Sequence, residues 1–207
     1  MTVFLHGMGH FHPENEITNQ FLEDLDIGTD DKWIMERVGI QTRRTVLPLD
    51  YIRETKNIDV RAGFEAQLYS NAEVGKRAAD LAIARAGIDP SEIGMVIAGS
   101  SCSDTTSPAE ACNIAKLLEL EVPAFDVNSA CTSFFTPLYL LSLMQADKLP
   151  PYILLVVPDT LTRAVDYRDR SSAVLWGDAA GAAVISTQVE GVAEIIGNTL
   201  ESSPAGN

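Results

Sequence analysis

The chain has 207 residues, of which 46% are hydrophobic and 21% charged, and this composition excludes a disordered, collagen-like or coiled-coil protein. Twenty-nine acidic against 15 basic side chains give a formal net charge of −14, which disfavours nucleic acid as a partner. The longest mostly apolar run, Phe134 to Met144, is too short and too interrupted to span a bilayer, and Met1 to Leu5 lack the basic start of a signal peptide. We therefore expect a globular, cytoplasmic protein with no membrane partner.

The three cysteines, Cys102, Cys112 and Cys131, are odd in number and fit no zinc-binding spacing. They indicate a reducing compartment, no disulfide framework and no metal site, and they leave a free thiol available as a nucleophile. All three histidines lie within the first dozen residues, from His6 to His12.

The first third of the chain predicts a strand over residues 3–7, followed by a glycine-rich turn over residues 7–10. A short helix is expected over residues 29–39, with acidic residues at its start and with Trp33 and Arg37 on one face. The clearest helix is expected over residues 71–86, because Ser70 and Glu73 form a capping box before it and Gly87 ends it.

The remaining two thirds alternate between apolar runs and helical segments. We expect strands at 95–98, 124–127, 152–157, 172–176, 182–186 and, weakly, 193–196, with a loop at 100–107 and helices at 108–118 and from about 131. This alternation predicts one α/β unit with a largely buried sheet and helices on its faces.

Cys131 follows the expected strand 124–127 and begins the expected helix. The free N–H groups and the dipole at a helix start favour the thiolate form of a cysteine placed there, and they could also stabilise an oxyanion. On spacing alone, the favoured interpretation of Cys131 is a small core residue, because free cysteines often pack in cores. Cys102 lies in a polar loop, and Cys112 on an apolar helix is expected to pack in the core.

Three separated motifs, DDKWIMERVGIQTRR, PAFDVNSACTSF and WGDAAGAAVIS, make the chain similar to the β-ketoacyl-acyl carrier protein synthase III family of the thiolase superfamily. The resemblance implies a thiolase-like α/β fold, layered αβαβα with a mixed buried sheet, of which residues 1–207 would be the first of two similar halves plus the start of the connection to the second. It also implies a Claisen-type condensation, in which a cysteine-bound acyl group reacts with a malonyl or β-ketoacyl thioester in fatty-acid or polyketide-like biosynthesis.

The resemblance also assigns roles to single residues. Cys131 matches the cysteine that accepts the acyl group. Trp33 matches a tryptophan that stacks on the adenine of coenzyme A, Arg37 a nearby arginine, Thr29 a threonine that contacts the same base, and Arg170 an arginine on the other face of the adenine. Without the resemblance, Trp33 reads as a core anchor and Arg37 as a solvated surface charge.

Other residues bear on the substrate. The resemblance places Ser107 where short-chain relatives carry a bulky aromatic that closes the acyl pocket, so a longer or bulkier acyl group is expected, and Phe134 is expected to line the same pocket. Thr132 and Ser133 replace the alanine and glycine that the family often has after its cysteine. The arginines 37, 43 and 44 are expected to form a basic patch for coenzyme A or an acidic carrier protein. The segment 177–181 lacks a Walker lysine and is read as a structural turn.

The family assists its cysteine with a histidine and an asparagine from the second half of the chain, and neither can be assigned here. A C-terminal half or a second polypeptide is therefore expected to supply them. Acyl-coenzyme A or acyl carrier protein thioesters are expected as substrates, with no separate cofactor, and the complete unit is expected to be a homodimer. Two alternatives stay open: a non-catalytic partner subunit of a heteromeric synthase, and an acyltransferase without condensation.

Overall fold

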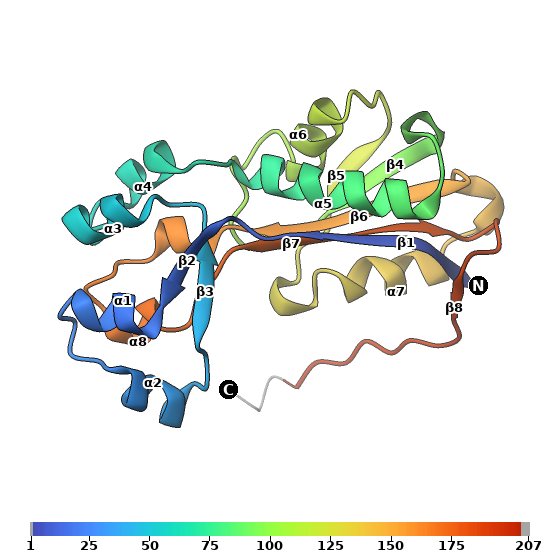
Figure 1. Cartoon of the computed structure of the whole chain (residues 1–207). Helices are drawn as coiled ribbons and strands as arrows, with labels where there is room; N and C mark the ends of the chain where they lie inside the picture. The colour runs from blue at the N-terminus through green and yellow to red at the C-terminus, as the bar shows by residue number, and fades with distance from the viewer. Residues whose placement is uncertain (1, 204–207) are drawn as a thin grey trace.

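The computed structural model describes residues 2–203, and its centre is a six-stranded mixed sheet (Figure 1). The strand order is β5-β4-β6-β7-β1-β8. The parallel part consists of β4 (Ile93–Ala98), β5 (Ala124–Asp126) and β6 (Tyr152–Asp159). Antiparallel pairs add β7 (Ala179–Ser186), β1 (Val3–Phe11) and β8 (Ala193–Ile195).

Helices cover both faces of this sheet, as the alternation of apolar runs predicts. On one face lie α5 (Asn71–Ala86) and α6 (Glu110–Leu117), and on the other lies α7 (Phe135–Leu143) (Figure 1). Neighbouring residues of β6 point to opposite faces of the sheet. Leu154 packs in the core under α5 and α6, whereas Leu155 packs in the core under α7. The layered α/β fold is therefore confirmed.

The glycines near the N-terminus do not make the expected turn, because β1 continues from Val3 to Phe11. A Cβ atom on Gly7 would lie 2.4 Å from the carbonyl oxygen of Ala82, and one on Gly9 would lie 2.0 Å from that of Ala78. Glycine in a strand often marks a place where another backbone comes close. These glycines let α5 pack directly onto β1, and the turn prediction over residues 7–10 is wrong for that reason.

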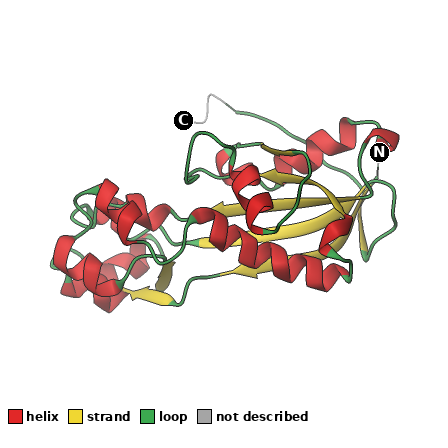
Figure 2. Ribbon diagram, turned by 90° about the horizontal axis from the view of Figure 1, so that it is seen from above, coloured by secondary structure: helices red, strands yellow, loops and turns green. Residues whose placement is uncertain are grey.

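A smaller lobe lies beside the sheet (Figures 1 and 2). It holds the hairpin of β2 (Asn15–Thr18) and β3 (Thr42–Thr45) and the short helices α1 (Asn19–Asp24), α2 (Asp31–Arg37), α3 (Leu49–Thr55), α4 (Val60–Ala66) and α8 (Arg170–Ala173). Its own apolar core includes Ile17, Leu22, Ile34 and Ile52, all fully buried. The helix expected around Trp33 is confirmed as α2, with Asp30 as its N-cap.

The strand expected over 172–176 is wrong, because residues 170–173 form α8 and Val174 is its C-cap. The Asp169 carboxylate accepts a hydrogen bond from the backbone N–H of Ser171 at 2.9 Å, and this cap starts a helix where apolar content alone suggests a strand. Ala173 and Val174 are buried in the lobe core rather than in the sheet.

Buried Asp178, which precedes β7, joins the lobe to the sheet, and buried Arg43 holds two segments of the lobe together. Asp178 accepts hydrogen bonds from the backbone N–H of Val46 at 2.8 Å and of Thr162 at 2.9 Å, and burial raises the pKa of its carboxyl group to about 6. Arg43, 4% exposed, donates to the carbonyl oxygen of Val174. The segment 177–181 is thus an anchor that leads directly into β7, which already begins at Ala179.

Helix α5 begins and ends as its sequence predicts, because Ser70 and Glu73 form a reciprocal capping box and Gly87 adopts a left-handed conformation at φ 68°. In the described part of the chain, four 3₁₀ segments connect other elements: η1 (Pro90–Glu92), η2 (Ala130–Thr132), η3 (Ala146–Lys148) and η4 (Leu161–Ala164). Within residues 2–203, none of the helices combines the length and the apolar character that a membrane crossing requires.

Candidate active site

Three loops meet where the parallel strands end. Gly99 follows β4, Val127 follows β5 and Thr160 follows β6. Ligand and catalytic groups of α/β proteins commonly collect at the carboxyl ends of parallel strands. Gly99 permits the close approach of two of these loops, because a Cβ atom there would lie 2.6 Å from the carbonyl oxygen of Val127.

Cys131 lies on the loop after β5 and is exposed, unlike the half-buried Cys102 and Cys112. It sits in the 3₁₀ turn η2, and α7 begins only at Phe135, so the expectation that Cys131 starts the helix is wrong. Pro137 lies in the first turn of α7, where backbone N–H groups make no helical hydrogen bonds. Its missing N–H therefore breaks no bond, and Pro137 does not kink the helix. Cys131 is therefore presented by a turn at the sheet edge.

Asn128 ties this turn to the loop after β4. Its side-chain amide donates to the carbonyl oxygen of Ser100 at 2.7 Å, and its side-chain oxygen accepts from the backbone N–H of Ala130 at 2.9 Å. Ser100 in turn donates to the Asp159 carboxylate at 3.1 Å, where β6 ends. Side chains thus link the ends of all three parallel strands directly beside the cysteine.

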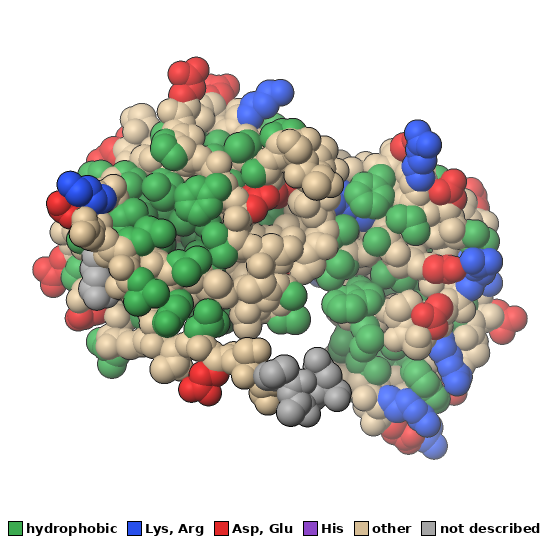
Figure 3. Space-filling view, turned by 180° about the vertical axis from the view of Figure 1, so that it is seen from behind, with side chains coloured by type: hydrophobic (Ala, Val, Ile, Leu, Met, Phe, Trp, Pro, Cys, Tyr) green, Lys and Arg blue, Asp and Glu red, His purple; other side chains and the backbone are tan. Residues whose placement is uncertain are grey.

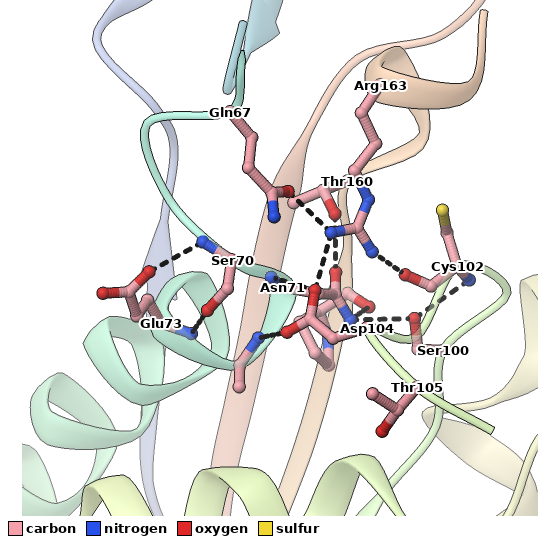
Figure 4. Close-up of polar contacts among 12 residues, drawn as sticks. Gln67, Ser70, Asn71, Glu73, Ser100, Cys102, Asp104, Thr105, Thr160 and Arg163 are labelled. Atoms are coloured by element: carbon pink, nitrogen blue, oxygen red, sulfur yellow. Dashed lines mark hydrogen bonds and ion pairs between the residues drawn. The ribbon is translucent and has the colours of Figure 1, made fainter. Parts of the chain in front are cut away.

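A buried arginine holds the loop after β4 from its other side (Figure 4). The side chain of Arg163 is fully buried, and its guanidinium pairs with Asp104 at 2.6 Å and donates to Gln67 at 2.7 Å and to the carbonyl oxygen of Cys102. Asp104 also accepts from the backbone N–H of Asn71 at 2.9 Å, at the start of α5. The loop 100–107 is therefore fixed by charge-assisted bonds to α5 and η4.

Glu110 adds a second buried acid to the same loop. It is 0% exposed, and one of its carboxylate oxygens accepts from the backbone N–H of Asp104 at 2.9 Å. Burial, together with the charges of Asp104 and Asp126, raises the pKa of Glu110 to about 7. Its backbone N–H donates to Asp126 at 2.8 Å, so Glu110 links the end of β5 to the loop after β4.

A second cluster lies in the small lobe. The guanidinium carbons of Arg37 and Arg170 each lie 4.8 Å from the ring centroid of Trp33. Arg170 also donates to the carbonyl oxygen of Gly28. Trp33 is half-buried against the lobe core, whereas both arginines are exposed. The structure thus brings together three of the four residues expected to contact adenine, and these groups suit a planar, anionic ligand.

Thr29, the fourth of these residues, lies in the same loop as Gly28. It is half-buried, and its hydroxyl oxygen is buried without a hydrogen-bond partner among residues 2–203. A buried hydroxyl without a partner is uncommon in native proteins. The Thr29 hydroxyl is therefore available to bond a ligand, and it lies one residue after the Gly28 carbonyl that accepts from Arg170.

The basic patch expected from arginines 37, 43 and 44 is wrong for Arg43, and an acidic partner offsets the charge of Arg44. Arg43 is buried and bonded to Val174 and Asn19, and Arg44 pairs with Glu16 at 2.9 Å. Side chains alternate along β3, so that Arg43 points inward while Arg44 stays exposed. The exposed cations in contact with the Trp33 ring are Arg37 and Arg170.

The two residues expected in the acyl pocket lie on different elements. Ser107 is exposed on the loop before α6. Phe134 is half-buried, packs against the core under α7, and meets the ring of Phe135 edge to face at 5.5 Å. Both stay predictions, since the geometry gives their positions but not a ligand.

Sequence reasoning missed the residues that hold the strand ends, namely Asn128, Ser100, Arg163, Asp104 and Glu110. A polar side chain two residues after a strand is a signal for Ser100 and Asn128, which follow β4 and β5, whereas Arg163, Asp104 and Glu110 lie farther from the strand ends and give no such signal. The histidines, in contrast, lie on or just after β1: His6 is buried with its ring 3.2 Å from the carbonyl oxygen of Val189, and His10 and His12 face each other at 5.3 Å.

A mixed sheet layered between helices, with an exposed cysteine where the parallel strands end, defines a thiolase-like protein. The family model of 3-oxoacyl-[acyl-carrier-protein (ACP)] synthase III matches residues 125–204, which include this cysteine. A β-ketoacyl-[acyl-carrier-protein] synthase III of Coxiella burnetii (strain RSA 331 / Henzerling II) is 33% identical over 188 residues, covering 90% of this chain and 53% of the relative.

Solved structures agree with the sequence matches. The 3-oxoacyl-[acyl-carrier-protein] synthase III from Aquifex aeolicus VF5 has a TM-score of 0.74 and 30% identity, covering 90% of this chain and 54% of that one. The priming β-ketosynthase of the R1128 polyketide pathway has a TM-score of 0.69 and 28% identity, covering 91% and 51%. The chain is thus similar to members of the β-ketoacyl-acyl carrier protein synthase III family, and it spans about half the length of the curated relatives it matches.

Proposed function

We propose that this chain is the acyl-accepting half of a condensing enzyme that forms a carbon–carbon bond on Cys131. The observation that carries the proposal is the exposed thiol on a turn tied to the ends of β4 and β6, in the segment that matches the family model. A cysteine fixed in this way can attack a thioester carbonyl repeatedly in one orientation.

The reaction would run in two steps. The Cys131 thiolate attacks the acyl thioester carbonyl, the bond from that carbonyl to the coenzyme A sulfur breaks, and coenzyme A leaves as its thiol after taking up a proton. A malonyl thioester then loses carbon dioxide, its α-carbon attacks the acyl-cysteine carbonyl, and the Cys131 thiolate departs. A β-ketoacyl thioester is released, and the thiol is ready for the next acyl group.

The adenine of coenzyme A would bind at Trp33, with Arg37 nearby, Arg170 on its far face, and the free hydroxyl of Thr29 as a polar contact. A purine between two planar groups needs about 3.5 Å on each side, or about 7 Å in all. Arg170 lies only 4.8 Å from the Trp33 centroid, so it must move away from the ring before the base enters. Its bond to the Gly28 carbonyl would be exchanged for contact with the ligand.

The acyl chain would lie near Ser107 and Phe134, where the small side chain of Ser107 leaves room for a longer or bulkier group. A histidine and an asparagine would be supplied by a further segment or a second polypeptide, because no histidine of this chain is in contact with Cys131 within residues 2–203. Acyl carrier protein would present the extender thioester, and the complete unit would form a homodimer.

The proposal is tested by assaying the chain together with the segment or polypeptide that carries the histidine and asparagine. With acyl-coenzyme A and a malonyl thioester, we expect carbon dioxide and β-ketoacyl product in equal amounts, and neither with Cys131→Ala. Cys102→Ala is the matched control and should retain activity. Unchanged turnover in Cys131→Ala would instead assign this chain to a non-catalytic partner role, and acyl transfer without carbon dioxide release would assign it to acyl transfer alone.

A further inference from the structure

The segment around Cys131, residues 128–136 (the cysteine turn), is rich in side-chain hydroxyl groups. Between Asn128 and Thr136 the side chains of Ser129, Thr132, Ser133 and Thr136 each carry one. All four take part in hydrogen bonds within this short segment. The function proposed above uses Cys131 and leaves these neighbours without a role.

The hydroxyls of Thr132, Ser129 and Thr136 form a chain. Thr132 Oγ1 is placed to donate to two acceptors, the carbonyl oxygen of Ser129 at 2.9 Å and the Oγ of Ser129 at 3.1 Å. Ser129 Oγ lies 2.6 Å from Thr136 Oγ1. Thr132 Oγ1 has one proton for these two acceptors, and Ser129 Oγ shares a further hydrogen bond with Thr136 in which either hydroxyl can donate. The three hydroxyls thus connect exposed Thr132 to buried Thr136 in α7.

A second set of bonds holds the other side of the turn. Ser133 Oγ accepts from the backbone N–H of Ser129 at 3.0 Å and donates to Asn128 Oδ1 at 3.3 Å. Asn128 Oδ1 also accepts from the backbone N–H of Ala130. The peptide groups before Cys131 are thus fixed by side chains from both directions.

These bonds hold a backbone conformation that the residue itself disfavours. Ala130, directly before Cys131, has φ 50°, in the left-handed region. That region costs an L-residue about 1–2 kcal/mol relative to the right-handed one, and glycine is the usual solution. Here alanine occupies the position, so the neighbouring hydrogen bonds must supply the constraint.

We propose that Thr132 is a positioning residue for the Cys131 thiol. Its hydroxyl clamps the Ser129 carbonyl, which holds Ala130 in its left-handed conformation and fixes the direction in which the next residue presents its sulfur. Acyl transfer needs the sulfur aligned with the thioester carbonyl, so a looser turn slows the transfer without weakening substrate binding. The inference rests on the proposed role of Cys131 as acyl acceptor.

The test is Thr132→Val, which removes the hydroxyl and keeps the shape of an exposed side chain. In the same assembly used for turnover, we expect the rate constant for acyl transfer from acyl-coenzyme A to Cys131 to fall about tenfold, with KM unchanged within about twofold. Alkylation by iodoacetamide, a small probe that needs no alignment, should keep its rate. Thr132→Ser should restore acyl transfer.

The matched control is Thr55→Val, since Thr55 on α3 also donates to a backbone carbonyl, that of Tyr51 at 2.7 Å. It should leave acyl transfer unchanged. The proposal is overturned if Thr132→Val transfers acyl groups at the native rate, if alkylation falls in parallel with transfer, or if the variant does not fold, since the last two results assign Thr132 to general stability. Absence of any acyl group on native Cys131 would instead overturn the proposed function.

Discussion

The end of the sheet that carries Cys131 and the lobe that carries Trp33 are constructed in different ways. At the sheet end, the buried side chains of Arg163 and Glu110 and the exposed side chain of Asn128 fix the loops by hydrogen bonds. In the lobe, an apolar core supports helices whose charged side chains stay on the surface, where Figure 3 shows cations and acids interspersed with apolar groups. Substitutions should therefore affect stability and pH response at the sheet end, and ligand binding in the lobe.

The largest effect is expected for Arg163→Met. Removing a fully buried guanidinium leaves Asp104 and the Cys102 carbonyl without their partner, and such losses cost about 3–5 kcal/mol. Urea unfolding measures the change. Arg168→Met is the control, because Arg168 forms an exposed pair with Asp166 at 2.7 Å and should cost less than about 1 kcal/mol. Equal losses in the two variants would mean that the sheet end is not held by its buried charge.

The pH response is expected to come from Glu110. Its pKa in the folded protein, about 7, lies above the usual 4.5, so the folded state binds the proton more tightly than the unfolded state. The stability from this group is therefore complete below pH 4.5 and is lost as the pH rises through 7. Glu110→Gln should flatten the decline in unfolding free energy across this range by an amount on the order of 2 kcal/mol. Asp178 and Asp159, whose pKa values are also raised by burial, add declines of the same sign, and an unaltered slope in Glu110→Gln would assign the decline to them.

The smallest effect is expected in the lobe. Trp33→Ala removes the ring that both arginines cover, and we expect acyl-coenzyme A to bind about tenfold more weakly, or about 1.4 kcal/mol, with the maximal rate of Cys131 acylation unchanged. Titration calorimetry and the concentration dependence of acylation measure the two quantities. Trp176→Ala, which alters the other tryptophan, 44% exposed, is the control and should change neither. A lower maximal rate with native affinity would place Trp33 with the sheet end and remove the distinction between the regions.

The sequence predicts the regular elements well where one local signal suffices. The capping box and terminal glycine define α5, and continuous apolar runs define β4, β6 and β7. Prediction from the sequence fails where tertiary packing, rather than a local signal, decides the conformation of a segment. Gly7 and Gly9 look like a turn but make room for α5, and Ala173 and Val174 look like a strand but fill the lobe core.

The candidate site follows the same rule. Trp33, Arg37 and Cys131 come from contiguous motifs, whereas the network around Arg163 joins segments up to 96 residues apart, as in the Arg163–Gln67 bond. Such contacts leave no local pattern. Arg43 is expected on the surface, but the alternation of side chains along β3 places it inside. There its guanidinium donates hydrogen bonds to the Val174 carbonyl and to the Asn19 side chain.

The central claim is that Cys131, and neither of the other two cysteines, accepts the acyl group. Incubation with acyl-coenzyme A, followed by proteolysis and mass mapping of all three cysteine peptides, tests it directly. We predict one acyl group on the peptide that contains Cys131 and unmodified Cys102 and Cys112. Acylation of Cys102 or Cys112, or no acylation of any peptide across short, long and branched acyl donors, would contradict the account.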